Sequence, residues 1–324
     1  MNQDQMYRVF FVVPPEVQLL DVSGPAHIFY EAKEYDAPIA SYFLSLDNES
    51  TQVSSTGLSL GNLQSFQHFE LGSNDWLIVP GLESHLIFDP DFIERLQPFL
   101  EWLKRQASNQ AKICSVCTGA YLLAFAGILD EKACTTHWKY LKDFHRRFPK
   151  VLLQKDRLFV KDQTIYSSAG VSSGIDLSLF LLEEQFGPVF ATKIAKEVVV
   201  YLRRTESDPQ LSIFLQYRNH IEHRIHQVQD LLAQKLEQKL KAEEIANIVN
   251  MSARNLTRLF KKTTGITIGE YVNKLRVERA VQLLSEGNKV QYVSSLCGLN
   301  SPNQLRELLQ KYEDALPSEL LKSS

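Results

Sequence analysis

Residues 243–265, Glu-Glu-Ile-Ala-Asn-Ile-Val-Asn-Met-Ser-Ala-Arg-Asn-Leu-Thr-Arg-Leu-Phe-Lys-Lys-Thr-Thr-Gly, have the spacing of a helix-turn-helix. Ile245, Ala246 and Val249 give a short first helix one apolar face, and Ala246 is small enough for another helix to cross closely. Asn250 then stands where the turn needs a left-handed backbone, which Asn tolerates at low cost. Ser252 follows as the expected cap of a second helix. The spacing therefore predicts two short helices joined by a tight turn.

The second of these helices is predicted to have one apolar and one basic face. Leu256, Leu259 and Phe260 recur at helical spacing and are expected to face inward. The residues expected to face outward include no acid and are Arg254, Asn255, Arg258, Lys261 and Lys262. A DNA major groove admits one helix, Arg and Asn match the edges of bases, and Lys pairs with phosphate. Double-stranded DNA is the predicted partner, and the alternative is the solvated face of an ordinary amphipathic helix.

A second copy of the pattern follows one long helix. Glu270–Ser285 is predicted to be that helix, and Gly287-Asn288 to end it. Residues 293–299 repeat the first helix and turn, and Ser301-Pro302 begins a further helix with apolar residues at helical spacing. The chain is therefore expected to end in an all-α domain with two helix-turn-helix units.

This tandem arrangement resembles the AraC/XylS family of bacterial transcription factors over residues 230–324. The matching motifs are Met251-Ser252, Leu256-x-Arg258-x-Phe260-Lys261-Lys262 with Gly265, Tyr271-x-x-x-Leu275-Arg276-Val277-Glu278-x-Ala280-x-x-Leu283-Leu284, Cys297-Gly298 and Pro317. The resemblance implies a transcription regulator that recognises specific DNA sequences.

The second unit departs from the family pattern. Glu307 takes the place that Arg258 has in the first unit, and Asp314 takes the place of Gly265. A carboxylate that faces phosphate repels it, so we expect the first unit to carry most of the recognition. The predicted DNA-binding residues are Ser252, Arg254, Asn255, Arg258, Lys261 and Lys262, with smaller contributions from Asn303, Gln304, Arg306 and Lys311.

Charge is divided unevenly along the 324 residues. From Asp230 onward there are 14 Lys and Arg against 11 Asp and Glu, which leaves 21 against 27 before it. The overall charge of −3 thus combines about +3 in the C-terminal part with about −6 in the rest. A module so mildly basic binds DNA weakly without sequence recognition, which favours a homodimer or direct contacts to bases.

Membrane insertion and disulfides are not expected. No apolar run approaches the roughly 18 residues of a membrane-spanning helix, and residues 1–8 lack a secretory apolar segment, so a cytoplasmic protein is predicted. The four cysteines are too scattered for a disulfide framework and are expected to be free thiols. Cys134 and Cys297 have no His or Cys at ligand spacing, so no metal or other cofactor is predicted.

Residues 1–204 have a different sequence pattern, in which short apolar runs alternate with stretches of helical periodicity. The expected strands are Val9–Val13, Tyr42–Leu46, Trp76–Val79, Ile113–Val116 and Thr164–Ser167, and the expected helices are Gly24–Lys33, Pro90–Gln106, His137–Arg147 and Gly174–Phe186. This alternation predicts a flavodoxin-like α/β domain with a largely parallel sheet between helices. Residues 205–229, which include Ser207-Asp208-Pro209, are predicted to be a helical linker, and residues 230–324 the DNA-binding domain.

Cys117 stands at a predicted sharp turn between a strand and the apolar helix Tyr121–Ala126. This is where a nucleophile elbow places its nucleophile. The helix N-terminus is expected to lower the pKa of the thiol and to favour the thiolate. The alternative is a buried, inert cysteine. Cys114 lies three residues earlier, and strand alternation is expected to send the two side chains to opposite faces, so no disulfide between them is predicted.

The neighbouring motifs resemble the ThiJ/PfpI, or class I glutamine amidotransferase-like, domain. These motifs are Leu19-Leu20-Asp21-Val22-Ser23-Gly24-Pro25, Val79-Pro80-Gly81-Leu82, Ile113 to Ala120 with Ala126-Gly127-Ile128-Leu129, Thr135-Thr136-His137-Trp138 and Ser168-Ala169-Gly170-Val171-Ser172-Ser173-Gly174-Ile175-Asp176-Leu177. The pairing of this domain with an AraC/XylS tail is similar to the GlxA-like regulators.

The resemblance implies a small-molecule pocket at Cys117. Its predicted ligand-binding residues are Asp21, Gly81, Leu82, Cys117, Thr118 and His137, with the N–H groups around Gly81 and Thr118 as an anion cradle. The superfamily's proteases place His directly after the nucleophile, where this chain has Thr118, so no adjacent general base is supplied. Asp21, Cys117 and Thr118 match the related isocyanide hydratases, and with His137 they are the vestigial catalytic candidates. A structural role for His137, half-buried and hydrogen-bonded, is the other interpretation.

These observations support three hypotheses. The function we predict is a transcription regulator whose N-terminal domain dimerises and binds a small metabolite without catalysis, which shifts the population between DNA-competent and incompetent arrangements. The family resemblance implies that this metabolite contains nitrogen. The alternatives are a Cys117-dependent hydratase or hydrolase, and a redox sensor in which Cys117 is oxidised to a sulfenic or sulfinic acid.

Overall fold

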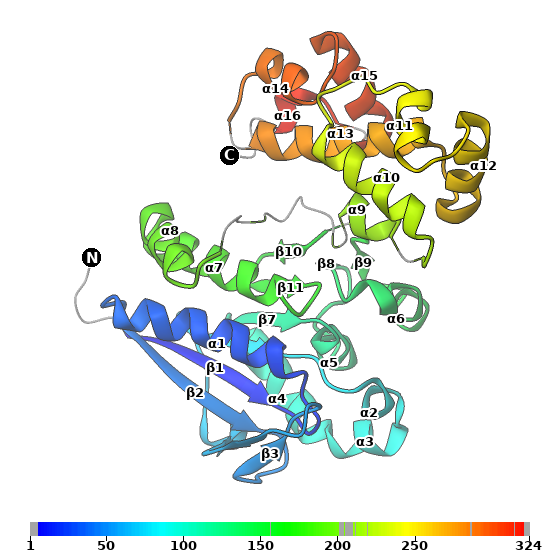
Figure 1. The fold of residues 1–324 in the computed structure, drawn as a ribbon. Helices are drawn as coiled ribbons and strands as arrows, with labels where there is room; N and C mark the ends of the chain where they lie inside the picture. Colours follow the sequence, from blue (N-terminus) through cyan, green and yellow to red (C-terminus); the bar gives the residue numbers. More distant parts are fainter. Residues whose placement is uncertain are drawn as a thin grey trace. The chain divides into compact units, whose positions relative to one another are not determined.

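The structure, a computed structural model, divides the chain into two compact units, Met1–Gln210 and Leu211–Ser324 (Figure 1). It describes residues 6–155, 157–200, 204, 210, 212–218, 220–285, 287–313 and 315–320. Two segments that the sequence analysis singled out, Ser207-Asp208-Pro209 and Asp314, lie outside these residues.

The first unit is built around a seven-stranded sheet in the order β10-β11-β7-β6-β1-β2-β5. Its strands are β1 (Tyr7–Val13), β2 (Ile39–Ser45), β5 (Gln64–Ser65), β6 (Trp76–Val79), β7 (Lys112–Val116), β10 (Phe159–Asp162) and β11 (Ile165–Ser168). All neighbouring pairs are parallel except β10 and β11. Two further pairs of short strands are β3 (Thr51–Val53) with β4 (Ser59–Gly61), and β8 (Ala133–Cys134) with β9 (Leu152–Leu153). The five strands expected from the sequence are the contiguous β11, β7, β6, β1 and β2, and the predicted fold class is confirmed.

Helices cover both faces of this sheet (Figure 1). The helices α1 (Leu19–Glu34), α7 (Ser173–Phe186) and α8 (Pro188–Glu197) lie on one face, and α4 (Gln97–Ser108) and α5 (Gly119–Phe125) on the other. The remaining helical segments of this unit are α2 (Ser84–Phe88), α3 (Pro90–Arg95), α6 (Leu141–Arg147) and the 3-10 turns η1 (Phe66–His68) and η2 (Trp138–Tyr140). Alternate residues of β1 enter separate cores: Val9 and Phe11 pack on the α1 side, and Phe10 on the α4 side. A strand buried on both faces needs this continuous apolar run.

Three expected helices of the first unit differ in the structure, and one of them, His137–Arg147, is the 3-10 turn η2 followed by α6. The helix expected at Gly24–Lys33 begins earlier, since α1 begins at Leu19 and contains Pro25. Gly24 serves close packing, since a Cβ there would lie 3.0 Å from Cγ1 of Ile175 on α7. The predicted single helix Pro90–Gln106 is two helices, which join at Leu96.

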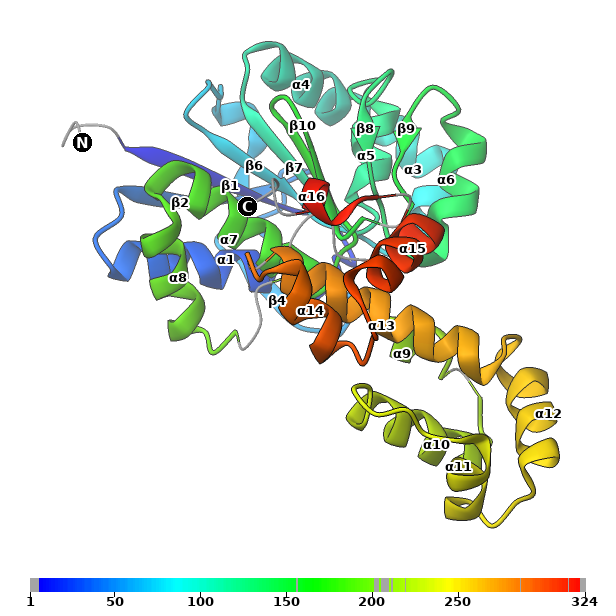
Figure 2. The same ribbon diagram turned by 90° about the horizontal axis from the view of Figure 1, so that it is seen from above.

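The second unit is entirely helical. Its helices are α9 (Ile213–Gln216), α10 (His223–Gln234), α11 (Ala242–Ile248), α12 (Ala253–Thr264), α13 (Ile268–Ser285), α14 (Val290–Leu296), α15 (Pro302–Glu313) and α16 (Pro317–Leu320). Figure 2 shows α13 running from α12 at one end to α14 and α15 at the other. Tyr271 and Leu275 of α13 belong to the core of the first half, and Ala280 and Leu284 to that of the second. One helix thus joins two small cores, as the sequence predicted.

The helix α10 begins before the predicted start of the DNA-binding domain at residue 230. Its Ile225 and Val228 are buried in the same core as Leu256 and Phe260 of α12. Residues 223–229, predicted to be part of a linker, therefore contribute to the core of the second unit.

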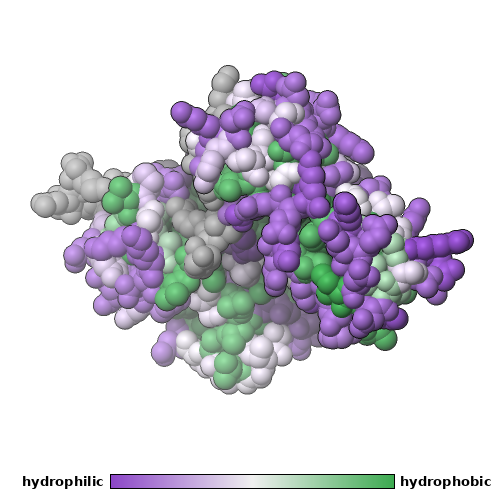
Figure 3. Space-filling view, turned by 45° about the horizontal axis from the view of Figure 1, so that its top comes forward, coloured by the Kyte–Doolittle hydropathy of each residue, from purple (hydrophilic) through white to green (hydrophobic). Residues whose placement is uncertain are grey.

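Hydrophilic residues dominate the face of the molecule drawn in Figure 3, and apolar residues are divided among separate patches. None of the helices among the described residues is long and apolar enough to cross a membrane.

Candidate DNA interface and cysteine site

The helix-turn-helix of the second unit is held by local interactions, of which the sequence predicted those at Asn250 and Ser252. Asn250 has a φ of 51°, the left-handed conformation that the turn requires. The Ser252 hydroxyl accepts a hydrogen bond from the Asn255 N–H and caps α12. Gly265 ends the helix at a φ of 83°. The bounds of α12 are therefore fixed at both ends by residues suited to those positions.

The face of α12 opposite the core is basic. Leu256 and Phe260 are fully buried, whereas all the outward residues predicted from the sequence are exposed. A shallow groove along this face has no acidic lining residue and is lined by Ala253, Arg254, Thr257, Arg258, Lys261 and Lys262. Thr257 was not among the predicted DNA-binding residues, although its spacing of three from Arg254 already placed it on the same face. Ser252 contributes its oxygen to the cap, and Asn255 does not line this groove.

The corresponding surface of the second half is less basic. Asn303, Arg306 and Lys311 are exposed, but Gln304 is half-buried and its side-chain oxygen accepts a hydrogen bond from the Asn300 N–H. The Arg306 guanidinium donates to Asn303 Oδ1 at 3.1 Å. The exposed Glu307 adds a negative charge beside them. Of the four predicted side chains, Asn303 and Arg306 are therefore bonded to each other, and Gln304 is bonded to the backbone of the preceding turn.

Cys117 of the first unit lies at a strained turn directly after β7. Its φ of 57° is unusual for a residue other than glycine, and α5 begins two residues later. Two glycines make this bend possible. A Cβ at Gly119 would lie 2.1 Å from the Val79 carbonyl oxygen, and one at Gly170 would lie 2.3 Å from Cys117 Cβ. The predicted elbow is present.

Asp21 joins this turn from α1. Its carboxylate is fully buried and accepts hydrogen bonds from the Val171 N–H at 2.7 Å and the Gly81 N–H at 3.1 Å. The thiol of Cys117 also donates to it. Burial raises the pKa of Asp21 to about 6, although the hydrogen bonds from Val171, Gly81 and Cys117 work against this shift. Asp21 is therefore a carboxyl group that titrates near neutrality.

The expected activation of the thiol is not found. Burial, followed by the charge of Asp21, raises the pKa of Cys117 well above its ordinary value, despite a hydrogen bond from the Thr118 N–H. The expectation of a lowered pKa was wrong because it considered the helix N-terminus and not the side chain's burial. The surroundings of Cys117 therefore favour the neutral thiol over the thiolate.

The predicted anion cradle is also occupied by internal contacts. The Gly81 N–H points to Asp21, and the Leu82 N–H lies 3.2 Å from the Thr118 hydroxyl. A Cβ at Gly81 would approach Asp21 Oδ2 to 2.7 Å and Thr118 Oγ1 to 2.8 Å. The sequence thus identified residues that meet in space, but the Gly81 N–H holds a carboxylate of the protein instead of a free anion.

His137 lies at the end of the 133–137 segment that approaches Cys117. It is half-buried and begins the turn η2, where its Nδ1 accepts a hydrogen bond from the Lys139 N–H at 3.4 Å. Burial lowers the pKa of His137 and favours the neutral ring. The residue of this segment that bonds to the Cys117 turn is Thr136 and not His137. The Thr136 hydroxyl donates to the Cys117 carbonyl oxygen at 2.9 Å. This geometry favours the structural interpretation of His137.

All four cysteines are buried free thiols, as expected. Cys114 and Cys117 contribute to the same core, although strand alternation predicted opposite faces. The reason is that β7 ends at Val116, so that Cys117 has already left the strand. Burial raises the pKa of Cys134 to about 12 and that of Cys297 to about 11. No group of three metal-ligating side chains occurs within the described ranges.

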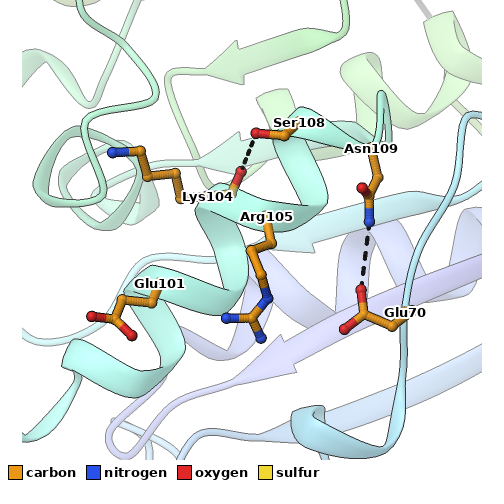
Figure 4. Close-up of a pocket in the computed structure, with 6 residues that line it drawn as sticks. All are labelled: Glu70, Glu101, Lys104, Arg105, Ser108 and Asn109. Atoms are coloured by element: carbon orange, nitrogen blue, oxygen red, sulfur yellow. Dashed lines mark hydrogen bonds between the residues drawn. The ribbon is translucent and has the colours of Figure 1, made fainter.

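A surface pocket of the first unit is lined by residues of α4 and of the loop after η1 (Figure 4). Its lining residues, none of which belongs to the Cys117 site, are Glu70, Glu101, Lys104, Arg105, Ser108 and Asn109. Two hydrogen bonds are local to it, from Asn109 to Glu70 and from Ser108 to the Lys104 carbonyl. Two acidic and two basic side chains leave this pocket without a charge preference.

Comparison with known proteins gives separate matches to the two units. Residues 7–184 match the DJ-1/PfpI family, and residues 245–323 match a helix-turn-helix domain. The chain is 32% identical over 213 residues to the HTH-type transcriptional regulator GbdR of Pseudomonas aeruginosa, a match that covers 65% of this chain and 58% of GbdR. It is 25% identical over 322 residues to the HTH-type transcriptional regulator CdhR of the same species, which covers 98% of this chain and 91% of CdhR. The crystal structure of an AraC family transcriptional regulator from Pseudomonas putida is similar with a TM-score of 0.50 at 22% identity, covering 59% of this chain and 99% of that one.

Proposed function

Because the chain belongs to the DJ-1/PfpI family and carries an AraC-type helix-turn-helix domain after that part, we propose that it is a transcription regulator. In this proposal the second unit binds specific sequences of double-stranded DNA, and the first unit forms a homodimer and binds a small metabolite. A cytoplasmic location is part of the proposal, because the chromosome that it would bind is there.

The observation that carries the proposal is the surface of α12. The helix has one fully buried apolar side and one exposed side on which Arg254, Arg258, Lys261 and Lys262 gather without an acid. An isolated α-helix of this kind fits a major groove, where Arg reads guanine and Lys pairs with phosphate. The two halves share one central helix, so both recognition helices belong to the same all-α unit. We assign the larger share of the binding energy to α12, because the equivalent of Arg258 on α15 is Glu307.

The test begins with a pool of genomic fragments selected by the purified full-length chain. A selected fragment is then titrated with wild-type protein, Arg258→Ala and Arg306→Ala at a fixed, physiological salt concentration. Loss of a base-contacting Arg costs about 1–3 kcal/mol, so Arg258→Ala is expected to weaken binding roughly tenfold to a hundredfold. Arg306→Ala, whose guanidinium already bonds to Asn303, is expected to have a smaller effect. The absence of any fragment preferred over random competitor would reject the proposal, and a larger loss for Arg306→Ala would reverse the ranking of the two halves.

For the first unit we propose that the residues around Cys117 bind an effector and do not turn it over. A buried carboxylate beside Cys117 repels an anion, so an effector without negative charge suits the site better, and the family resemblance suggests a nitrogen-containing molecule. The raised pKa of the Cys117 thiol opposes nucleophilic catalysis, which needs the thiolate. The hydratase alternative would be supported by turnover of an isocyanide that disappears in both Cys117→Ser and Asp21→Asn.

Effector binding is proposed to act by a shift of population. An effector changes DNA affinity only to the extent that it binds the two arrangements of the dimer with different affinity. Operator titrations with and without the effector test this step, and coinciding curves would reject it. The oligomeric state is tested separately by sedimentation of the full chain at the concentration used for the titrations.

A further inference from the structure

A cavity of about 460 Å³ lies inside the helical unit, between residues 235–240, α11 and the first half of α13. We call it the Arg276 cavity, after the α13 residue that lines it together with Ile268 and Val272. Its volume is within the range of about 300–1,000 Å³ that small-molecule sites occupy. Among its described lining residues only Thr257 comes from α12, so the exposed cationic side chains of that helix are not used by it.

Arg276 is buried in this cavity without a full set of partners. It is only 9% exposed, and its Nη2 donates to the Leu236 carbonyl oxygen at 3.3 Å. Its Nε has no hydrogen-bond partner in the part of the chain that the structure describes. A buried charged donor left unpaired is costly, because it has lost water and gained no acceptor. The Nε atom itself has almost no accessible surface, so a ligand in the cavity would have to reach the terminal nitrogens of the guanidinium.

The charges around the cavity have one sign. Lys235 and Lys239 are exposed at its rim, and no Asp or Glu occurs among its described lining residues. Lys239 is also hydrogen-bonded to the Asn300 side chain. A guanidinium can bind a carboxylate through two parallel hydrogen bonds, whereas Lys acts as a point charge. Arg276 is therefore the residue suited to fix the orientation of a carboxylate.

The rest of the wall is mainly apolar. Its partly exposed apolar residues are Leu236 and Leu240 on one side and Ile268 and Val272 on α13. These side chains belong to the core of the first half or pack against it. An inorganic anion would leave this surface uncovered, whereas an aliphatic chain would cover it at about 25 cal/mol per Å² of apolar surface removed from water.

We propose that the Arg276 cavity is a second ligand site, which binds a small aliphatic carboxylate. The carboxylate bonds to the Arg276 guanidinium, and the aliphatic chain lies along Ile268, Val272 and Leu236. This site goes beyond the proposed function, which places the effector at Cys117 in the other unit. It would give the DNA-binding unit a ligand response of its own, since Thr257 belongs both to this wall and to the basic groove of α12.

Octanoate, octanol and inorganic phosphate are the probes, each titrated into the full-length chain by isothermal titration calorimetry. Octanoate is expected to bind saturably and at least tenfold more tightly than octanol or phosphate, because only octanoate matches both parts of the wall. Equal affinity for octanol would remove the role of Arg276. Equal affinity for phosphate would make the cavity a general anion site, such as one for the DNA backbone, and would overturn the carboxylate assignment.

Variants locate the binding. Arg276→Lys keeps the charge and loses the paired hydrogen bonds, so octanoate affinity is expected to fall about tenfold. Gly269→Leu is expected to fold, because its Cβ would meet no atom within 4 Å and Leu favours a helix more than Gly does. Its side chain is added to the wall of the cavity, so octanoate is expected to bind more weakly. Lys289→Ala, an exposed residue of the same unit that does not line the cavity, is the matched control and is expected to bind as the wild type does. Circular dichroism verifies that each variant is folded. Unchanged affinity in Gly269→Leu and Arg276→Lys would place octanoate elsewhere and overturn the proposal, and if Arg276→Lys does not fold, Gly269→Leu decides it alone.

Discussion

Replacing the buried Asp21 by Asn should change how the stability of the first unit depends on pH. The folded unit holds Asp21 with a pKa of about 6, against an ordinary value of 3.8, because the carboxylate is buried. A group whose pKa is raised by folding stabilises the folded state while it is protonated. This contribution is complete below pH 3.8 and is lost as the pH rises toward and through 6. Asn has no such titration, so the difference between the two proteins isolates the effect of Asp21.

The size of the effect follows from the two pKa values. At pH 7 the full difference between about 6 and 3.8 corresponds to about 3 kcal/mol. About 1 kcal/mol of this has already been lost at pH 4.5, so the wild type should lose about 2 kcal/mol relative to Asp21→Asn between pH 4.5 and pH 7. The substitution also removes an acceptor for the Gly81 or Val171 N–H, which shifts the whole curve but not its slope.

Urea unfolding followed by tryptophan fluorescence measures this difference. All three tryptophans, Trp76, Trp102 and Trp138, lie in the first unit, so the signal reports on that unit alone. Parallel curves for the wild type and Asp21→Asn from pH 4.5 to 7 would refute the argument from burial.

Asp143→Asn is a control, because the pKa of Asp143 is shifted in the opposite direction to that of Asp21. Burial raises the pKa of Asp143, but hydrogen bonds from Arg146, Tyr121 and Arg147 more than offset this, and its net pKa is lowered. Its contribution to stability is therefore present above the ordinary pKa and is lost as the pH falls. The control variant should lack this loss at low pH.

Three other outcomes follow from the structure. Gly170→Ala would place a Cβ 2.3 Å from Cys117 Cβ at a φ of 96°, and should destabilise the first unit by more than about 2 kcal/mol in the fluorescence assay, whereas near-wild-type stability would contradict the close approach. Phe260→Ala removes a fully buried ring that packs edge-on against Tyr271, and should cost the second unit about 3–5 kcal/mol in thermal unfolding followed by circular dichroism. The protonated thiol of Cys117 should react with hydrogen peroxide far more slowly than a free thiolate. Mass spectrometry after mild peroxide treatment should therefore show Cys117 unmodified. Rapid formation of a sulfinic acid at this residue would instead support the redox-sensor hypothesis.

The helix-turn-helix shows how much local sequence determined. Asn250, Ser252 and Gly265 act through their own backbone conformation or on residues within one helical turn, and Asn250 and Ser252 lie as predicted. The basic face of α12 follows from the period of the helix alone, and the same period already contained Thr257, which was overlooked. The five central strands were also recognisable, because strands buried on both faces are continuous apolar runs.

Short or irregular elements were not recognisable in this way. β8, β9 and β5 contain two residues each, which is too little for a periodic pattern. The helix α1 begins five residues before Gly24, because its Gly and Pro serve packing against α7 and do not mark a helix start. α10 belongs to the second unit because Ile225 and Val228 are buried there, which no local signal in a polar, His-rich segment revealed.

The sequence by itself determined the two kinds of domain and the basic helix, because caps, turns and periodic faces depend on neighbours along the chain. Only the tertiary structure decided the chemistry at Cys117 and Arg276. Asp21, Gly81, Cys117 and Val171 meet from four separate segments, and their mutual burial raises the pKa of both the thiol and the carboxyl group, which a helix N-terminus alone would not predict. Arg276 looked like one more residue of a family motif until the fold buried it beside a cavity with its Nε unpaired among the described residues. Desolvation depends on everything that surrounds a group, and that information is not contained in any one stretch of the chain.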